Sequence, residues 1–227
     1  TEAGEEAEAL QKFGVEDSQT GLWNRRYFDR GLGGECERAW RYGRPLSVAF
    51  ADMDGFKAIN DRFSHATGDV VLKTFAGLLS SLLRKSDVFA RYGGDEFAIL
   101  LSDLDSTDEA MTVAEKLLSC LDTPYRLQGQ DVHVGGSIGL AFYPGDAQDS
   151  ENLLRYADLA MYQAKRPGRG TYACFSAQMD QHAHVHMQLH ARLKEAIKNN
   201  SFKLFYQPQV DVKSGLIIGA EALLRWH

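Results

Sequence analysis

The sequence predicts an α/β domain in which helices cover a mixed central sheet. Two observations predict it. Short apolar segments alternate with longer segments whose apolar residues recur at helical spacing, the pattern of strands connected by helices. Two apolar runs within 88–101 are separated by Gly93-Gly94, a signal for an antiparallel hairpin. Helical crossovers and a hairpin in one domain predict a sheet with both strand orientations.

The first half of the domain contains two helices and three strands by this pattern. Leu22, Phe28 and Leu32 favour a helix that continues toward Trp40. The remaining elements are a strand at 46–52, a helix at 70–83 and two strands within 88–101.

The second half repeats the alternation. A helix is expected over 110–121, with Asp108 and Glu109 suited to its positive N-terminal end. Ser150 is the expected N-cap of a second helix that runs to Lys165, where Pro167-Gly168 breaks it. Strand regions are expected at 132–143 and 171–175.

The chain has 227 residues, enough for one complete domain and part of a second. Residues 1–16 are expected to be the end of an incoming linker helix, 17–176 the α/β domain, and 177–199 a connecting helix. Residues 200–227 are expected to start another domain with two strands, 202–212 and 216–226, joined by Lys213-Ser-Gly215.

Composition excludes several classes of protein. A formal net charge of −6 makes nucleic acid a poor candidate partner. Cys36, Cys120 and Cys174 are widely spaced and predict reduced thiols of a cytoplasmic protein. No apolar run approaches the ~20 residues of a membrane span. A membrane link is therefore expected only through an anchor in a longer parent protein.

Four acidic residues lie where predicted strands end. Asp52 and Asp54 close the strand at 46–52, and positions i and i+2 of a strand point to the same side. Asp95 and Glu96 follow Gly93-Gly94, and a second strand would bring them near the first pair. Either pair alone would simply be solvated. Together they favour a site for a hard cation such as Mg²⁺, because converging carboxylates repel one another without one.

These residues belong to motifs that occur in a fixed order. The segment Arg91-Tyr-Gly-Gly-Asp-Glu-Phe97 resembles the signature of the GGDEF diguanylate cyclase family, and the resemblance covers about 17–176. Four residues depart from the family pattern without removing a catalytic group: Gln19, Trp23, Ser64 and Gly170. Ser64 would strain its loop if that position requires a positive φ. The other matching segments are 17–25, 52–61, 64–69, 137–139 and 157–165.

The resemblance implies a mainly antiparallel sheet flanked by helices, like the palm of nucleotidyl cyclases and polymerases. It implies that two GTP molecules are condensed into cyclic di-GMP and two pyrophosphates, with Mg²⁺ or Mn²⁺ as cofactor. Each domain would supply one GTP, so activity would require a homodimer.

The family's roles transfer to individual residues. Asp52 and Asp95 would bind the metal with help from the Met53 carbonyl, and Asp95 would be the base for the attacking 3′-hydroxyl. Glu96 lies beside it as a further catalytic residue, and Lys57 would stabilise charge on the phosphates. The remaining implied contacts to substrate are Asn60 and Asp69 for guanine, His65 with either a substrate or a loop role, Lys165 and Arg169 for phosphates, and Gly93 and Gly94 for close approach of the backbone.

Arg84 and Asp87 form an Arg-x-x-Asp pattern six residues before Gly93. The resemblance implies an inhibitory site for cyclic di-GMP there. A salt bridge at a helix end is the alternative.

The C-terminal segment resembles the start of an EAL cyclic di-GMP phosphodiesterase, as in tandem GGDEF-EAL proteins. The family is a TIM-like barrel in which Glu221 would bind metal and Gln207 and Arg225 would contact substrate. Two strands of a barrel are not expected to hydrolyse cyclic di-GMP. The GGDEF part could instead be a GTP-binding regulatory module for an attached phosphodiesterase, or a structural dimerisation module.

Overall fold

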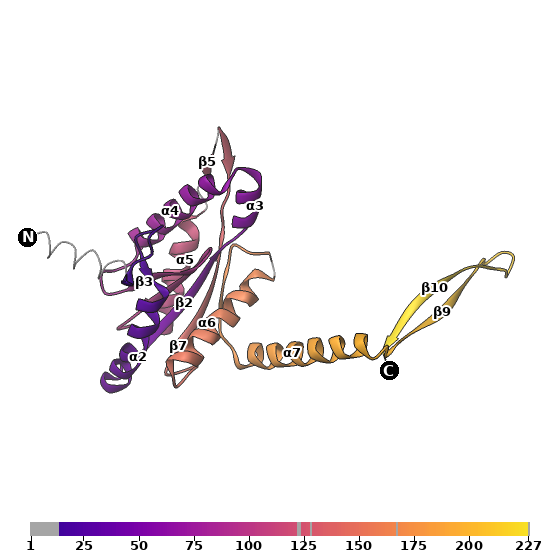
Figure 1. The fold of residues 1–227 in the computed structure, drawn as a ribbon. Coiled ribbons are helices and arrows are strands. Elements are labelled where there is room, and N and C mark those ends of the chain that lie inside the picture. Colours follow the sequence, from indigo (N-terminus) through magenta and orange to yellow (C-terminus); the bar gives the residue numbers. More distant parts are fainter. Residues whose placement is uncertain (1–13, 122–123, 128, 167, 227) are drawn as a thin grey trace, which may run out of the picture. The chain divides into compact units, whose positions relative to one another are not determined.

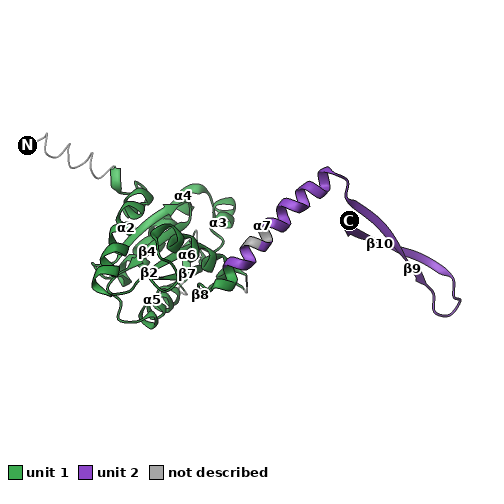
Figure 2. Cartoon of the chain, turned by 90° about the horizontal axis from the view of Figure 1, so that it is seen from below, with its two compact units in different colours: residues 1–179 green, residues 180–227 purple. Residues whose placement is uncertain are grey.

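The computed structural model describes residues 14–121, 124–127, 129–166 and 168–226. The chain divides into two compact units, 1–179 and 180–227 (Figure 2). Most of the expected linker helix at 1–16 lies outside the described residues. The first unit is an α/β domain and the second carries a separate pair of strands.

A six-stranded sheet forms the centre of the first unit (Figure 1). Its spatial order is β1-β3-β4-β2-β7-β8. The pairs β3–β4, β4–β2 and β2–β7 are antiparallel, whereas the outer pairs β1–β3 and β7–β8 are parallel. This confirms the mixed, mainly antiparallel sheet. The strands are β1 (Trp23–Asn24), β2 (Leu46–Met53), β3 (Val88–Gly93), β4 (Glu96–Leu101), β7 (Gly136–Tyr143) and β8 (Tyr172–Cys174).

Helices cover both faces of this sheet. One face packs against α2 (Arg25–Tyr42) and α6 (Ser150–Lys165). The other packs against α3 (Phe56–Arg62), α4 (His65–Leu82) and α5 (Thr107–Cys120). All eight residues of β2 are buried, because the strand is central and has helices on both sides.

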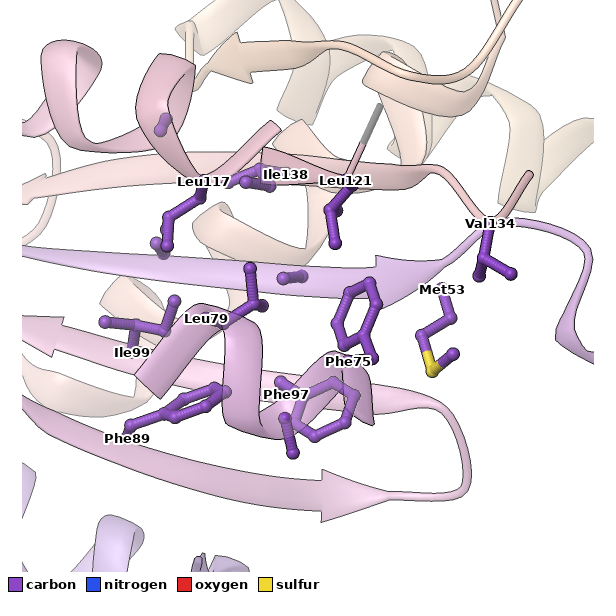
Figure 3. Packing of buried hydrophobic residues seen from close by; sticks show 14 of the residues in the cluster. Met53, Phe75, Leu79, Phe89, Phe97, Ile99, Leu117, Leu121, Val134 and Ile138 are labelled. Atoms are coloured by element: carbon purple, nitrogen blue, oxygen red, sulfur yellow. The ribbon is translucent and has the colours of Figure 1, made fainter. Parts of the chain in front are cut away.

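The larger core lies between the sheet and α4 and α5 (Figure 3). Phe75 of α4 packs on Phe97 of β4 with ring centroids 5.3 Å apart, and Phe89 of β3 lies 5.6 Å from Phe97. Fully burying a side chain of this size stabilises the fold by about 1.5–3 kcal/mol. This core holds rigid the strands that end at the acidic residues.

Several local features differ from the sequence prediction. The short helix α3 and the hairpin of β5 (Tyr125–Leu127) with β6 (Gln130–Val132) were not predicted, because each is too short to show a period. The strand region expected at 132–143 is divided, and β7 begins at Gly136. Asp149, not Ser150, is the N-cap of α6. The Asp149 carboxylate accepts the Asn152 amide at 2.7 Å, and Ser150 is already helical.

Gly139 explains one of the sequence motifs. A Cβ at this position of β7 would lie 2.0 Å from the Met161 nitrogen and 2.1 Å from the Ala157 carbonyl oxygen. Glycine is therefore required for β7 and α6 to pack backbone against backbone. This packing brings Lys165, at the end of α6, toward the site.

The second unit contains most of α7 (Ala177–Lys198) and an antiparallel pair, β9 (Phe202–Val210) and β10 (Ile217–Trp226). Glu221 lies directly opposite Gln207 in the register, and both are exposed. Within the described part of the chain, these two strands form no closed barrel. No described helix is both long and apolar enough to cross a membrane.

Candidate active site

The end of β2 is the centre of the site. Asp52 pairs with Glu96 of β4 on one side and with Ser137 of β7 on the other. Only 8% of Asp52 is exposed. The next residue, Met53, donates its amide to the Asp95 carbonyl at 3.1 Å. The backbone thus attaches the β3–β4 turn to the end of β2.

The β3–β4 turn carries Asp95 at its tip. Gly93 is the last residue of β3 and pairs with Glu96, so the tip consists of Gly94 and Asp95. The prediction of a turn at Gly93-Gly94 is therefore shifted by one residue. The reason is an irregularity between Arg91 and Gly93, which adds a residue to β3. Gly94 has a φ of 54°, which favours glycine.

A lysine faces the buried carboxylate. The Lys165 ammonium lies 2.8 Å from Asp52 Oδ2. Burial raises the pKa of Asp52, and the carboxylates of Asp95 and Asp54 raise it further, whereas Lys165 lowers it. Burial also raises the pKa of Glu96, with smaller contributions from Asp158 and Asp52. The site therefore concentrates negative charge that water screens poorly, which favours a bound cation.

The Asp54 carboxylate is occupied by contacts within the protein. Its carboxylate accepts the Ser137 hydroxyl at 2.9 and 3.1 Å and the Gly170 amide at 3.0 Å, and Arg169 Nε lies 3.9 Å away. Asp52 and Asp54 were expected to point to the same side, as positions i and i+2 of one strand. This is wrong for Asp54, because β2 ends at Met53 and Asp54 lies beyond it. Asp54 instead fixes the loop after α6 to the beginning of β7.

The oxygen ligands at this site fit a Mg²⁺ ion that is bound by only a few protein groups. Across the described ranges, no three His, Cys, Asp or Glu side chains gather as a metal site. Asp52, Asp95 and the Met53 carbonyl would provide two carboxylates and one backbone oxygen. Mg²⁺ in proteins is commonly held by one or two carboxylates plus substrate phosphates and water. The Lys165 ammonium already places a positive charge beside Asp52.

The expected guanine residues lie on α3 and α4. Asn60 Oδ1 is buried and has no hydrogen-bond partner among the residues described. A Cβ on Gly68 would lie 1.9 Å from that oxygen, so glycine makes room for Asn60. Asp69 is exposed one position further along α4 and accepts a hydrogen bond from the Gln19 side chain. Lys57 and His65 are exposed on the same two helices.

Ser64 confirms the expected strain before His65. Its φ is 147° and its ψ is 162°, a region almost restricted to glycine. The Ser64 hydroxyl accepts the Thr67 amide at 3.3 Å and so caps α4. The side chain provides a cap where the backbone favours glycine.

The role of Arg91 was not predicted from the sequence. Its guanidinium donates to the Gly94 carbonyl at 3.0 and 2.7 Å and to both Asp17 oxygens at 3.2 and 3.3 Å. It also donates to Gln19 Oε1. The signal was a charged residue in a strand that is otherwise largely apolar. Arg91 connects the loop before β1 to the turn that carries Asp95.

Arg84 and Asp87 form a tight turn between α4 and β3. The Arg84 amide donates to Asp87 Oδ2 at 2.8 Å, and the Asp87 amide donates to the Arg84 carbonyl at 3.0 Å. The Arg84 guanidinium instead pairs with Glu109 of α5 at 2.6 Å. An anionic ligand at Arg84 would therefore compete with Glu109.

A helix-flanked, mainly antiparallel sheet with carboxylates at adjoining strand ends defines a palm-like domain of the nucleotidyl cyclase class. Residues 15–171 match the family model described as "Diguanylate cyclase, GGDEF domain", and residues 190–227 match the EAL domain. The chain belongs to the GGDEF diguanylate cyclase family and continues into the start of an EAL domain.

Curated relatives that are similar to this chain include a bifunctional enzyme and a diguanylate cyclase. "Bifunctional diguanylate cyclase/cyclic di-GMP phosphodiesterase MucR" of Pseudomonas aeruginosa is 40% identical over 96% of the chain and 32% of its own length. Diguanylate cyclase TpbB of the same species is 44% identical over 68% of the chain and 36% of its own length. The chain thus spans about a third of these curated relatives.

Solved structures agree with the fold. The GGDEF domain of TpbB from Pseudomonas aeruginosa has a TM-score of 0.72 at 40% identity, covering 74% of this chain and 99% of that one. The coiled coil and GGDEF domain of DgcB from Caulobacter crescentus, in complex with c-di-GMP, has a TM-score of 0.70 at 27% identity. It covers 76% of this chain and 92% of that one.

Proposed function

We propose that this GGDEF domain condenses two GTP molecules into cyclic di-GMP in a Mg²⁺-dependent reaction. The observation that carries the proposal is the junction of Asp52, the Asp95 turn and Lys165 at the end of the central strand. The junction combines two candidate metal carboxylates with a cation suited to phosphate. Family membership supports cyclic di-GMP synthesis as the reaction.

The reaction is a nucleotidyl transfer. The 3′-oxygen of one GTP forms a bond to the α-phosphorus of the other, the α–β phosphoanhydride bond breaks, and pyrophosphate leaves. Asp95 accepts the proton of the 3′-hydroxyl. A second transfer closes the ring, so each product releases two pyrophosphates.

Basic residues would hold the triphosphate. Lys57, Lys165 and Arg169 supply positive charge to the phosphate oxygens, and Gly93 and Gly94 let the backbone approach closely. When the metal ion binds Asp52, Lys165 would leave that carboxylate and bind phosphate instead. Asp52, Asp95 and the Met53 carbonyl would hold Mg²⁺, which would stabilise charge at the transferred phosphate.

Guanine recognition would use Asn60 and Asp69, with His65 as a further substrate contact. A carboxylate accepts both N1–H and N2–H of guanine, and adenine does not present that pair of donors. Asn60 Oδ1 is buried and has no partner among the described residues, which supports a polar ligand at this position.

Two copies must face each other, because each domain holds one GTP. Cyclic di-GMP bound at Arg84 and Asp87 would bridge a pair of domains in an arrangement that does not bring their two GTP molecules together, and would so lower turnover. The cyclic di-GMP complex of DgcB shows that a relative binds this product. In a longer parent, Glu221, Gln207 and Arg225 would belong to the EAL site, and the domain would be cytoplasmic.

The test is incubation with GTP and Mg²⁺ followed by chromatography. We expect cyclic di-GMP and pyrophosphate in a ratio of one to two, at a specific activity that rises with protein concentration. Chelation of the metal should abolish product. Intact GTP under all these conditions would contradict the proposal.

The matching EAL segment favours one alternative, a GTP-binding module that controls an attached phosphodiesterase. "Cyclic di-GMP phosphodiesterase NbdA" of Pseudomonas aeruginosa is 36% identical over 96% of this chain. The alternative predicts GTP binding without product formation, so the same incubation with a parallel binding measurement separates the two.

A further inference from the structure

The loop before β1 is closed by its own hydrogen bonds. Asp17 Oδ1 accepts both the amide and the hydroxyl of Thr20 at 2.8 Å. The Asp17 amide donates to the Leu22 carbonyl at 2.7 Å, and the Gly21 amide donates to the Asp17 carbonyl at 2.8 Å. Gln19 lies within this closed loop and is half-buried.

The Gln19 side chain bridges two charged residues of the domain. Its Nε2 donates to Asp69 Oδ1, and its Oε1 accepts from Arg91 Nη1. An ionised carboxylate only accepts and a guanidinium only donates. The amide therefore has one orientation that satisfies both neighbours, with its NH₂ group toward Asp69.

Arg91 continues this connection to the catalytic turn. Only 13% of its side chain is exposed, and it donates twice to the Gly94 carbonyl beside Asp95. Hydrogen bonds thus run without interruption from the Asp69 carboxylate through Gln19 and Arg91 to the tip of the β3–β4 turn.

We propose that Gln19 is a positioning residue for guanine recognition, which fixes the Asp69 carboxylate and couples it to the turn that carries Asp95. The inference rests on the proposed role of Asp69. A carboxylate offers about four lone-pair positions, and the two donors of guanine occupy two of them. The Gln19 donor can therefore remain in place beside the base.

The physical benefit is preorganisation. Asp69 is exposed on α4, and a side chain that must be ordered on binding reduces affinity by its lost rotamer freedom. Gln19 restricts Asp69 before the nucleotide arrives. If Gln19 instead filled the position that guanine takes, removal of its side chain would tighten GTP binding. The two hypotheses therefore predict opposite changes in GTP affinity.

The test is calorimetry with non-hydrolysable analogues of GTP and ATP. Gln19→Leu removes both hydrogen bonds with little change in size. We expect the GTP analogue to bind about tenfold more weakly, the equivalent of about 1.4 kcal/mol. Binding of the ATP analogue should not change. Gln130→Leu is the matched control, because it removes an amide that bonds Arg62 at 2.7 Å on the unrelated β6.

A second variant separates positioning from support of the fold. Gln19→Glu keeps the acceptor for Arg91 but places a carboxylate against Asp69. Without a donor toward Asp69, this variant should lose its preference for the GTP analogue about as Gln19→Leu does. Loss of fold stability alone would not change base selectivity.

The outcomes distinguish two failures. If the unaltered protein does not prefer the GTP analogue, the proposed guanine role of Asp69 is wrong. If it does, and Gln19→Leu binds equally or more tightly, the Gln19 inference is overturned while the proposed function stands.

Discussion

The Lys165 ammonium lies 2.8 Å from the carboxylate of Asp52, at the end of the buried central strand β2. Burial raises the pKa of Asp52 above its ordinary value, and Lys165 partly opposes this. The folded state therefore binds this proton more tightly than the unfolded chain does. The resulting contribution to stability is present below the unfolded pKa and is lost as pH rises through the folded pKa.

Asp52→Asn should consequently raise the melting temperature at neutral pH, because it removes a poorly solvated charge. The gain should shrink as pH falls toward about 4. Lys165→Met should have the opposite effect, destabilising the fold at neutral pH by about 1–3 kcal/mol, because it leaves Asp52 without its partner. Thermal melting at two pH values measures both. A lower melting temperature for Asp52→Asn at neutral pH would argue against this account of the site.

Gly68→Ala and Gly77→Ala test whether Asn60 needs the space beside α4. Both glycines lie in α4, where alanine favours the helix by about 1 kcal/mol. A Cβ at Gly68 would lie 1.9 Å from Asn60 Oδ1, whereas a Cβ at Gly77 meets no described atom within 4 Å. We expect Gly77→Ala to stabilise the protein and bind the GTP analogue normally. Gly68→Ala should weaken that binding at least about tenfold through displaced Asn60. Equal affinities of the two variants for the GTP analogue would show that Asn60 does not bind the base.

Asp69→Ala should reduce the preference for GTP over ATP. The carboxylate offers guanine two acceptors, and a site that lacks it no longer discriminates by that edge. Competition of ATP against labelled GTP measures the preference before and after the change. Should ATP and GTP compete equally against the unaltered protein, Asp69 has no part in reading the base.

Feedback by product is expected to depend on the Arg84–Glu109 pair, whose closest atoms lie 2.6 Å apart. Arg84→Ala should weaken cyclic di-GMP binding about tenfold to a hundredfold, because it removes a bidentate donor. Glu109→Gln should tighten it by a few-fold, since a competing anion is removed. Calorimetry with product, beside initial rates, tests both. Unchanged affinity in Arg84→Ala would refute the inhibitory site and leave the cyclase proposal intact.

Much of the fold could be predicted because its signals are local. The β2 strand is a continuous apolar run, and α6 shows helical spacing bounded by Pro167-Gly168, so both elements match closely. The α3 helix and the β5–β6 hairpin could not be predicted in this way. Each forms from too few residues for a period to develop, and they pack against the α4–α5 core.

The residue types of the site could be predicted from the sequence better than the hydrogen bonds that join them. The strand rule placed Asp52 and Asp54 together, but Asp54 lies beyond the end of β2 and turns to Ser137 and Gly170. The bridge from Asp69 through Gln19 to Arg91 joins three distant segments of the chain. Such contacts depend on the complete packing of the domain, which sequence spacing does not contain.

Conversion of GTP with Mg²⁺ by the unaltered protein and by Asp95→Asn tests whether this domain is a cyclase with Asp95 at its centre. Asp131→Asn, an exposed acid on β6, is the matched control. We expect cyclic di-GMP from the unaltered protein and from the control. Asp95→Asn should be at least about a hundredfold slower, because the proposed base and metal ligand disappear together. Cyclic di-GMP formation by Asp95→Asn at the rate of the unaltered protein would contradict this expectation.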